Sequence, residues 1–387
     1  MRVSTRGEVE PFIVMDVMTR AAELEAEGHH IIHMEVGQPG TPAPAMARQA
    51  LVGALEAGSL GYSLTLGLPE LRAGIAKLYD RWYGVDLDPE RVVVTSGSSA
   101  GFLLSFAALF DAGDKVGIGA PGYPSYLQIL RAMDLQPVVL ETAPEHRYQP
   151  TPADIAGQGL DGLLVASPGN PSGTMLDRAA LSGLIGAAQE AGTAFISDEI
   201  YHGLHYEERA VSALEVTGDC YVINSFSKYF SMTGWRVGWM VVPEDHVRRV
   251  ERLAQHMFIC APAASQVVAL AALEAEEELE ANRAVYARNR KLLLEGLPRA
   301  GFGRIAPPDG GFYIYADVSD LTSDSRLFAR EILEQAGVAV TPGLDFDKGR
   351  GLGTLRFSYA AASADIEEAL RRLTRFMAGR ERVAAGR

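Results

Sequence analysis

The sequence predicts an α/β protein with a mostly parallel sheet that is covered by helices on both faces. Short runs rich in β-branched residues alternate with longer amphipathic segments through the middle of the chain. The chain has 387 residues, of which 48% are hydrophobic, so it can bury a large core and build two or three domain-sized units. This alternation is typical of a parallel sheet whose strands are connected by helices.

Six runs are predicted to form strands of this sheet. In chain order they cover residues 92–94, 115–119, 137–140, 162–166, 194–198 and 221–224. The segments between them carry a helical pattern, as residues 100–110 and 178–191 do. In such sheets the ligand binds beyond the carboxyl ends of the strands, so the residues that follow each strand are the candidates for chemistry.

A smaller α+β unit is predicted in the last third of the chain. A long charged helix begins near residue 281, and short strands follow around residues 311–318 and 354–359. The segment before Gly37 is helical and amphipathic, and we expect it to pack on this unit rather than on the sheet. We therefore predict a large domain at 40–280 and a small domain built from both termini, 1–39 and 281–387, with a cleft between them.

The composition argues against nucleic-acid, membrane and metal partners. The net charge of −14 repels phosphates and anionic membrane surfaces, and no block of Lys and Arg offsets it. The longest apolar runs are too short to span a bilayer, and residues 1–20 lack the apolar core of a secretion signal. Cys220 and Cys260 are too few for a disulfide framework and lack metal-ligand spacing. We expect a cytoplasmic protein without a metal site.

Lys228 stands in the most informative stretch, residues 225–238, SFSKYFSMTGWRVG, directly after a predicted strand. A lysine among small hydroxyl residues at a strand end can form an imine with an aldehyde cofactor, because desolvation lowers its pKa and frees the neutral amine. Ser225, Ser227 and Arg236 can meet a phosphate group, with the arginine as a bidentate partner. The alternative is a solvated surface lysine, which is the commoner state of this residue type.

Two further strand ends carry polar residues suited to a pyridine ring. Asp198 ends the strand at 194–198, and a carboxylate bonded to a pyridine nitrogen keeps it protonated, which makes the ring an electron sink. Asn170, in the turn-rich stretch 167–174, can donate to a phenolic oxygen of the cofactor, with Tyr201 as a second donor. As alternatives, Asp198 can cap a helix and the stretch around Asn170 can be only a rigid turn.

Two earlier strand ends complete the set. Residues 95–100, TSGSSA, link a strand to a helix, so Ser98, Ser99 and the backbone N–H groups can bind a phosphate at the helix N-terminus. Tyr123 follows the next strand and can stack on a flat ring, or it can simply be packed. Each signal alone is common, but five strand ends that supply complementary groups have a small joint chance of occurrence.

With these motifs the sequence resembles the class I/II aminotransferases, the fold-type I enzymes that use pyridoxal 5′-phosphate (PLP) and are similar to aspartate aminotransferase. The resemblance spans residues 37–356, and its motifs agree in order and spacing. It implies a large domain with a mostly parallel seven-stranded sheet and a smaller α+β domain. It also implies that Lys228 holds PLP as a Schiff base.

The resemblance implies a role for each candidate residue. Lys228 is the proton carrier, and the other cofactor contacts are Asp198 on the pyridine nitrogen, Asn170 and Tyr201 on the phenolic oxygen, Tyr123 on the ring, and Ser98, Ser99, Ser225 and Arg236 at the phosphate. Arg356 matches the arginine that grips the substrate α-carboxylate, and Gly37 matches the loop that lines the substrate site. Tyr62 matches the tyrosine that reaches the phosphate of the neighbouring subunit, which implies a homodimer with shared active sites.

The implied reaction is aminotransfer in two halves. The amino acid displaces Lys228 from PLP, and the freed amine moves the α-proton to the cofactor carbon as a general base. Hydrolysis releases an oxo acid and leaves pyridoxamine phosphate, which a second oxo acid converts back to PLP. Ping-pong kinetics follow from this sequence of steps.

The expected amino donor is neutral or apolar, with pyruvate or 2-oxoglutarate as acceptor. Ser99 stands where one branch of the family places a lysine for a distal carboxylate. Another branch supplies an arginine from the partner subunit, yet residues 253–282 contain no Lys or Arg. His256 remains a candidate for that role.

Two alternatives to aminotransfer stay open on the sequence. The same cofactor supports carbon–sulfur lyases, decarboxylases and aminocyclopropane-carboxylate synthases, because PLP stabilises carbanions from several bond cleavages. A non-catalytic PLP-binding amino-acid sensor would carry a basic DNA-binding module, for which Gly37 and Arg356 lie too close to the chain ends. The Arg356 match and the lack of a lyase motif favour aminotransfer.

Overall fold

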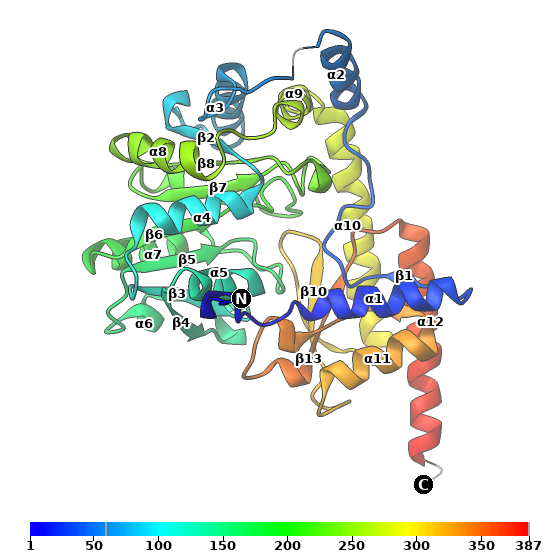
Figure 1. Cartoon of the computed structure of the whole chain (residues 1–387). Coiled ribbons are helices and arrows are strands. Elements are labelled where there is room, and N and C mark those ends of the chain that lie inside the picture. The colour runs from blue at the N-terminus through cyan, green and yellow to red at the C-terminus, as the bar shows by residue number, and fades with distance from the viewer. Residues whose placement is uncertain (59, 386–387) are drawn as a thin grey trace.

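A seven-stranded mixed sheet forms the centre of the larger part of the molecule (Figure 1). The computed structural model describes residues 1–58 and 60–385. The strand order across the sheet is β2 (Val92–Thr95), β8 (Gly238–Val241), β7 (Tyr221–Ser225), β6 (Ala194–Asp198), β5 (Gly162–Ala166), β3 (Lys115–Ala120) and β4 (Gln136–Glu141). The pairs from β7 to β4 are parallel, and β8 runs antiparallel to both its neighbours. The predicted fold class is confirmed.

Alternate residues of the strands enter two different cores, one on each face of the sheet. Ile196 of β6 and Ile223 of β7 belong to the core covered by α4 (Ser98–Leu109), α5 (Pro124–Ala132) and α8 (Val247–Met257). Phe195 and Val222, one position earlier, belong to the core on the other face. The helices there include α3 (Pro69–Tyr83), α7 (Arg178–Glu190) and α9 (Ala263–Ala272), while α2 (Ala45–Glu56) packs on α9 and the short α6 (Pro152–Ile155) on α7.

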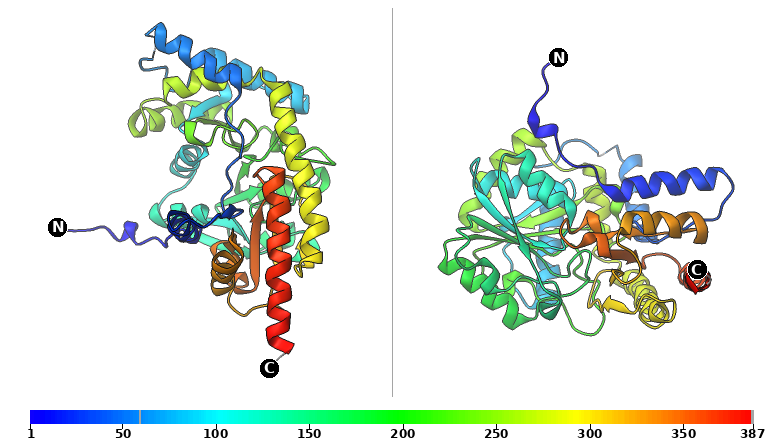
Figure 2. Two further views of the ribbon diagram at one scale, coloured as in Figure 1. Left: turned by 90° about the vertical axis from the view of Figure 1, so that its right-hand side faces the viewer. Right: turned by 90° about the horizontal axis from the view of Figure 1, so that it is seen from below.

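The smaller unit is built on an antiparallel sheet. Its strand order is β12 (Thr341–Pro342), β13 (Thr354–Ser358), β10 (Tyr313–Asp317) and β9 (Arg304–Ala306). Three helices belong to this part of the chain, α10 (Glu276–Arg299), α11 (Ser325–Ala336) and α12 (Ser363–Ala385). Figure 2 shows α10 and α12 side by side, and the two helices are in contact. The proposed domain boundary at 280/281 falls inside the first turns of α10.

The amino-terminal segment packs on this smaller unit, as the sequence predicts. Helix α1 (Ile13–Ala26) contacts α11 and β12, and Figure 2 shows α1 running alongside α11. Strand β1 (Ile32–His33) pairs in parallel with β11 (Val338–Ala339). After β1 the chain continues past Gly37 to α2, and it enters the large sheet only at β2.

Within residues 1–58 and 60–385, the structure contains no helix that is both long and apolar enough to cross a membrane. The same residues contain no group of three or more His, Cys, Asp or Glu side chains arranged to hold a metal ion.

The start of α1 is held by a side chain from the far end of the sequence. The carboxylate of Asp345 accepts hydrogen bonds from the backbone N–H groups of Ile13, at 3.0 Å, and Val14, at 3.2 Å. Asp345→Ala leaves both donors without this acceptor, so we expect the free energy of unfolding to fall by about 1 kcal/mol in urea titrations. Asp324→Ala, which removes the cap of α11, is the matched control and should cost a similar amount. An unchanged stability of the Asp345 variant would contradict this role.

Candidate active site

A cavity of about 280 Å³ lies at the carboxyl ends of β5 and β6, where the large sheet faces the smaller unit. Ten of the twelve predicted site residues line it: Gly37, Ser98, Ser99, Tyr123, Asn170, Asp198, Tyr201, Lys228, Arg236 and Arg356. They come from segments that are far apart in the sequence. The parallel strands bring them together because their carboxyl ends share one edge of the sheet.

Lys228 is a largely desolvated amine at the base of this cavity. Its Nζ donates a hydrogen bond of 2.5 Å to the backbone oxygen of Gly37. Burial, together with the nearby guanidinium groups of Arg356 and Arg236, lowers the pKa of Lys228 from 10.5 to about 8. The other four lysines of the chain are exposed: Lys77, Lys115, Lys291 and Lys348. Lys228 is thus the lysine that can present a neutral amine near physiological pH.

Asp198 is a buried carboxylate that faces the same cavity. It accepts hydrogen bonds from the Tyr126 hydroxyl and, at 3.0 Å, from the Ile200 N–H group. Burial raises the pKa of Asp198 to about 6, and the two hydrogen bonds and Lys228 oppose that rise. A protonated pyridine nitrogen beside this carboxylate would stabilise its charged form, so the environment suits the predicted role.

Arg356 is a buried guanidinium, 4% exposed, on β13 of the smaller unit. Its Nη1 donates to Asn170 Oδ1 at 2.9 Å, and its Nη2 donates to Thr341 Oγ1 at 3.1 Å and to the backbone oxygen of Glu35. Its Nε has no hydrogen-bond partner. A buried donor without a partner in a cavity is a site for an acceptor, and a carboxylate is the acceptor that a guanidinium binds best.

Asn170 and Tyr201 offer further hydrogen-bond donors in the cavity. Because a guanidinium only donates, the oxygen of the Asn170 amide faces Arg356 and its nitrogen is left to donate elsewhere. The Tyr201 hydroxyl lies 3.0 Å from the Tyr313 hydroxyl. Gly37 is the residue that permits this crowding, because a Cβ atom there would lie 1.6 Å from the Tyr313 hydroxyl oxygen.

The N-terminus of α4 and Arg236 form a cradle for an anion. Ser98 and Ser99 begin this twelve-residue helix and line the cavity, and the first N–H groups of a helix are available to an anion. Arg236 lies over the turn before the helix, because a Cβ on Gly97 would come within 2.3 Å of its Nη2. The φ angle of Arg236 is 51°, a strained conformation for a residue other than glycine, which is found most often at functional sites.

Two predicted site residues do not line the cavity. Ser225 is the last residue of β7, and its hydroxyl is bonded to Ser227 Oγ at 2.8 Å and to the Val237 oxygen at 3.1 Å. Ser227 lines the cavity in its place. Tyr62 is 84% exposed and is absent from the cavity wall. His256, the candidate for a distal carboxylate, is exposed on α8 and is also absent from the cavity wall.

Several lining residues were missed by the sequence analysis. Tyr126 lies in the first turn of α5, three residues after Tyr123, which is the N-cap of that helix. Its nearness in the sequence to Tyr123 was the available signal. Phe12, Val14 and Tyr313 reach the cavity from the smaller unit and its amino-terminal helix. Nothing local in the sequence marks them, because their position depends on the packing of that unit.

The donor set of the cavity fits PLP. The cradle of α4 and Arg236 suits the phosphate, Asp198 suits the ring nitrogen, and the Asn170 amide and Tyr201 hydroxyl suit the phenolic oxygen. Lys228 supplies the amine that the aldehyde requires. The unpartnered Nε of Arg356 is then left for the substrate carboxylate.

Comparisons with known proteins find a family model, related sequences and similar solved structures. The family model for aminotransferase class I and II matches residues 29–373. The valine–pyruvate aminotransferase of Mycobacterium tuberculosis is 46% identical over 96% of this chain and 97% of its own length. The crystal structure of a candidate aminotransferase from Silicibacter pomeroyi is 69% identical, with a TM-score of 0.94 over 98% of this chain and 100% of that one. Aspartate aminotransferase from Thermus thermophilus with maleate is 32% identical, with a TM-score of 0.91 over 97% and 100%.

The lowered pKa of Lys228 predicts how added PLP is captured. Below pH 8 the amine is protonated and unreactive, so the rate of covalent capture by the cofactor-free protein should rise with pH around a midpoint of about 8. Stopped-flow absorption at a series of pH values measures this rate. Lys228→Ala should bind PLP only non-covalently. A midpoint near the ordinary lysine value of 10.5 would show that the amine is not desolvated.

Proposed function

Because this chain belongs to the family of class I and II aminotransferases, we propose that it uses PLP to transfer an amino group from a neutral or apolar amino acid to a 2-oxo acid. Transfer of an amino group between an amino acid and a 2-oxo acid follows from the family and its relatives, which favour it over a lyase or an amino-acid sensor. The proposal of a neutral or apolar amino donor rests on the distribution of charged side chains in the cavity.

Each cationic side chain among the described residues of the cavity wall has a role in the proposed site. Lys228 meets the aldehyde, Arg236 the phosphate and Arg356 the α-carboxylate. A distal carboxylate would be desolvated there without a partner, which is costly. The valine–pyruvate aminotransferase is also more similar to this chain, at 46% identity, than the Thermus aspartate/prephenate aminotransferase, at 32%.

Apolar side chains make up part of the cavity wall. They come from the amino-terminal segment, the loop after β1, α4 and the end of β6: Phe12, Val14, Val36, Phe102 and Ile200. The ring of Phe12 packs edge-on against Tyr123 at a centroid distance of 6.0 Å. An aliphatic donor side chain would be removed from water against these groups, and a charged one would lose its hydration.

PLP, when bound, supplies the aldehyde that receives the amino group and a ring that delocalises the electrons of the broken Cα–H bond. The residues of this chain bind, orient and move protons around it. Arg356 fixes the substrate carboxylate, which aims the α-hydrogen at Lys228. The Nζ of Lys228, whose pKa is lowered to about 8, takes the α-proton and returns it as a general acid. Asp198 holds a proton on the ring nitrogen through its buried carboxylate.

The proposal includes a homodimer in which Tyr62 reaches the phosphate site of the partner subunit. Support comes from exposed apolar side chains that gather around Tyr62, α2 and the loop before α9: Met46, Val52, Leu55, Leu64, Met257 and Ile259. The segments are adjacent, since α2 packs on α9 and Gln266 of α9 donates to Ser63 at 2.9 Å. Exposed apolar side chains on neighbouring segments are typical of an interface. A cytoplasmic location is proposed on the sequence grounds given above.

Removing the guanidinium of Arg356 should weaken substrate binding selectively. Arg356→Ala loses the charged hydrogen bonds to the α-carboxylate, so we expect KM for the amino acid to rise about 100-fold. The dissociation constant of PLP, from absorption titration, should change little. An unchanged KM would mean that another group holds the carboxylate.

A donor series tests the proposed function directly. The purified protein with PLP and pyruvate or 2-oxoglutarate should use valine and leucine with a kcat/KM about 100-fold above that for aspartate. Phe12→Ala should lower kcat/KM for the apolar donors about tenfold, since it removes packing from the wall of the cavity. Val3→Ala, in the same segment but 83% exposed, is the control. Aspartate as the best donor would contradict the proposed donor class.

A further inference from the structure

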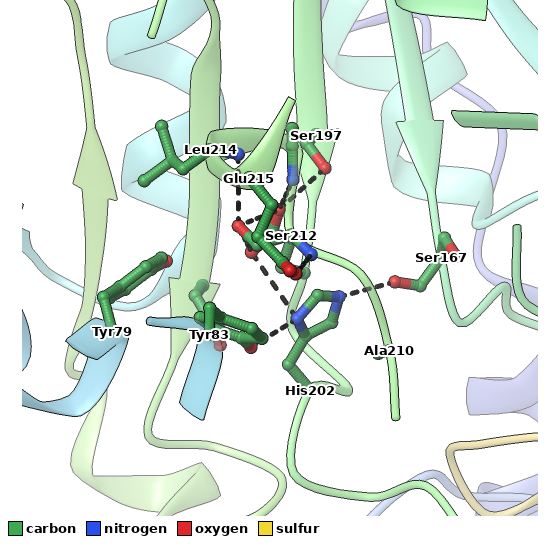
Figure 3. A network of polar contacts seen from close by, with 12 residues as sticks. Tyr79, Tyr83, Ser167, Ser197, His202, Ala210, Ser212, Leu214 and Glu215 are labelled. Carbon is green, nitrogen blue, oxygen red and sulfur yellow. Dashed lines mark hydrogen bonds and ion pairs between the residues drawn. The ribbon is translucent and has the colours of Figure 1, made fainter. Parts of the chain in front are cut away.

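A buried polar cluster lies behind the cavity, around the residue that follows Asp198. Its members are Tyr83, Ser167, Ser197, Glu199, His202 and Ser212, and none of the six belongs to the described cavity wall. Figure 3 shows His202 between Tyr83 and Ser167, with Ser197 and Ser212 close by. Glu199 is 0% exposed and His202 2% exposed. The aminotransfer reaction as described above uses neither side chain.

Glu199 is satisfied by neutral donors rather than by a cation. Its two oxygens accept from Ser212 Oγ at 3.0 and 2.9 Å, and one also accepts from the Ala213 N–H group at 2.8 Å and Ser197 Oγ at 3.1 Å. Burial raises the pKa of Glu199 to about 8, so the carboxyl group is largely protonated at neutral pH. Its backbone N–H donates to Ile223 at 2.8 Å, which ties it to β7.

The hydrogen bonds of His202 define its tautomer. Nε2 lies 2.8 Å from the Ser167 backbone oxygen, which can only accept, so Nε2 carries the proton. Nδ1 is then an acceptor, and the Tyr83 hydroxyl donates to it at 2.6 Å. Burial lowers the pKa of His202 to about 3, so the imidazole is neutral. The 3.5 Å approach of Nδ1 to Glu199 Oε2 is therefore not an ion pair.

This cluster connects the two segments that carry the ring-binding groups. Glu199 and His202 stand one and four residues after Asp198, at the end of β6. Ser167 begins the loop after β5 that carries Asn170, and Asn170 in turn accepts from Arg356 at 2.9 Å. Ser197 and Glu199 flank Asp198, so their side chains leave the chain on the face opposite to the cavity. The imidazole thus braces the β6 end against the β5 loop from behind.

We infer that Glu199 and His202 are positioning residues, which hold the Asp198 carboxylate and the Asn170 amide at the separation that the cofactor ring requires. The inference rests on the proposed function, because these two groups are the ones assigned to the ring. Asp198 and Asn170 touch the cofactor, whereas His202 acts through the backbone of Ser167. Loss of its Nε2 donor would free the Ser167 oxygen and let the loop shift relative to β6.

A pair of variants at one position tests this inference. His202→Phe keeps the ring but removes the donor to Ser167, and His202→Gln keeps an N–H group near the position of Nε2. We expect His202→Phe to raise the dissociation constant of PLP about tenfold and His202→Gln to restore most of the affinity. The pH at which the visible absorption of bound PLP titrates should also shift in His202→Phe, because that pH reports the groups around the ring.

A second tyrosine–histidine pair, outside the cluster, supplies the control. The hydroxyl of Tyr221 on β7 lies 3.0 Å from Nδ1 of His246, away from the cavity wall. His246→Phe should lower the melting temperature without changing PLP affinity or the titration of its absorption. If His202→Phe behaves in the same way as His246→Phe, the cluster serves folding alone and the positioning role is wrong.

Two further measurements distinguish a failure of the positioning role from a failure of the proposed function. If His202→Phe fails to fold, Tyr83→Phe removes only the donor to Nδ1 and should weaken PLP binding about threefold; no change in that variant would also overturn the inference. The unmodified protein is measured first. Absence of PLP binding there would remove the proposed function and the inference together, whereas normal binding with unaffected variants would remove the inference alone.

Discussion

The shared carboxyl edge of β5, β6 and β7 is the constraint on which the site depends. Parallel pairing places the ends of these strands side by side, with Ala166 opposite Asp198 and Asp198 opposite Ile223. An acid, an amide and an amine that are up to 58 positions apart in the sequence therefore meet in one cavity. The smaller unit closes that cavity with Arg356 and Tyr313, which desolvates Lys228 and lowers its pKa.

The charged side chains of the cavity wall are mostly positive, whereas the net charge of the whole chain is negative. The protein carries a net charge of −14, yet its cavity wall presents three cationic side chains and one buried carboxylate. Burial and, to a smaller extent, the two guanidinium groups lower the pKa of Lys228 to about 8, while the phosphate and carboxylate of the ligands would compensate Arg236 and Arg356. The net negative charge of the chain therefore does not indicate the charge of the substrate. The arrangement of the three cations in the cavity wall does indicate which anionic groups the cavity can bind.

The sequence predicted those parts of the molecule that depend on local pattern. The six β-branched runs and the polar residues after them predicted the sheet and most of the site, because strands and turns are marked by residues that are neighbours in the sequence. Strand β8 was missed, since it has four residues and directly follows the motif around Lys228. The sequence places the end of this strand at Asn224, whereas β7 includes Ser225; the Ser225 hydroxyl is bonded to Ser227 Oγ, and Ser227 is the one of the two that lines the cavity. Phe12 and Tyr313 depend on packing across units, which no local pattern records.

Borohydride reduction of the PLP-loaded protein, followed by peptide mass spectrometry, tests the central claim most directly, because it makes the bond between lysine and cofactor permanent. We expect a single modified peptide, with the cofactor mass on Lys228, and no modification of the exposed lysines Lys77, Lys115, Lys291 and Lys348. Modification of one of those four lysines in place of Lys228, or no modification under saturating PLP, would contradict it.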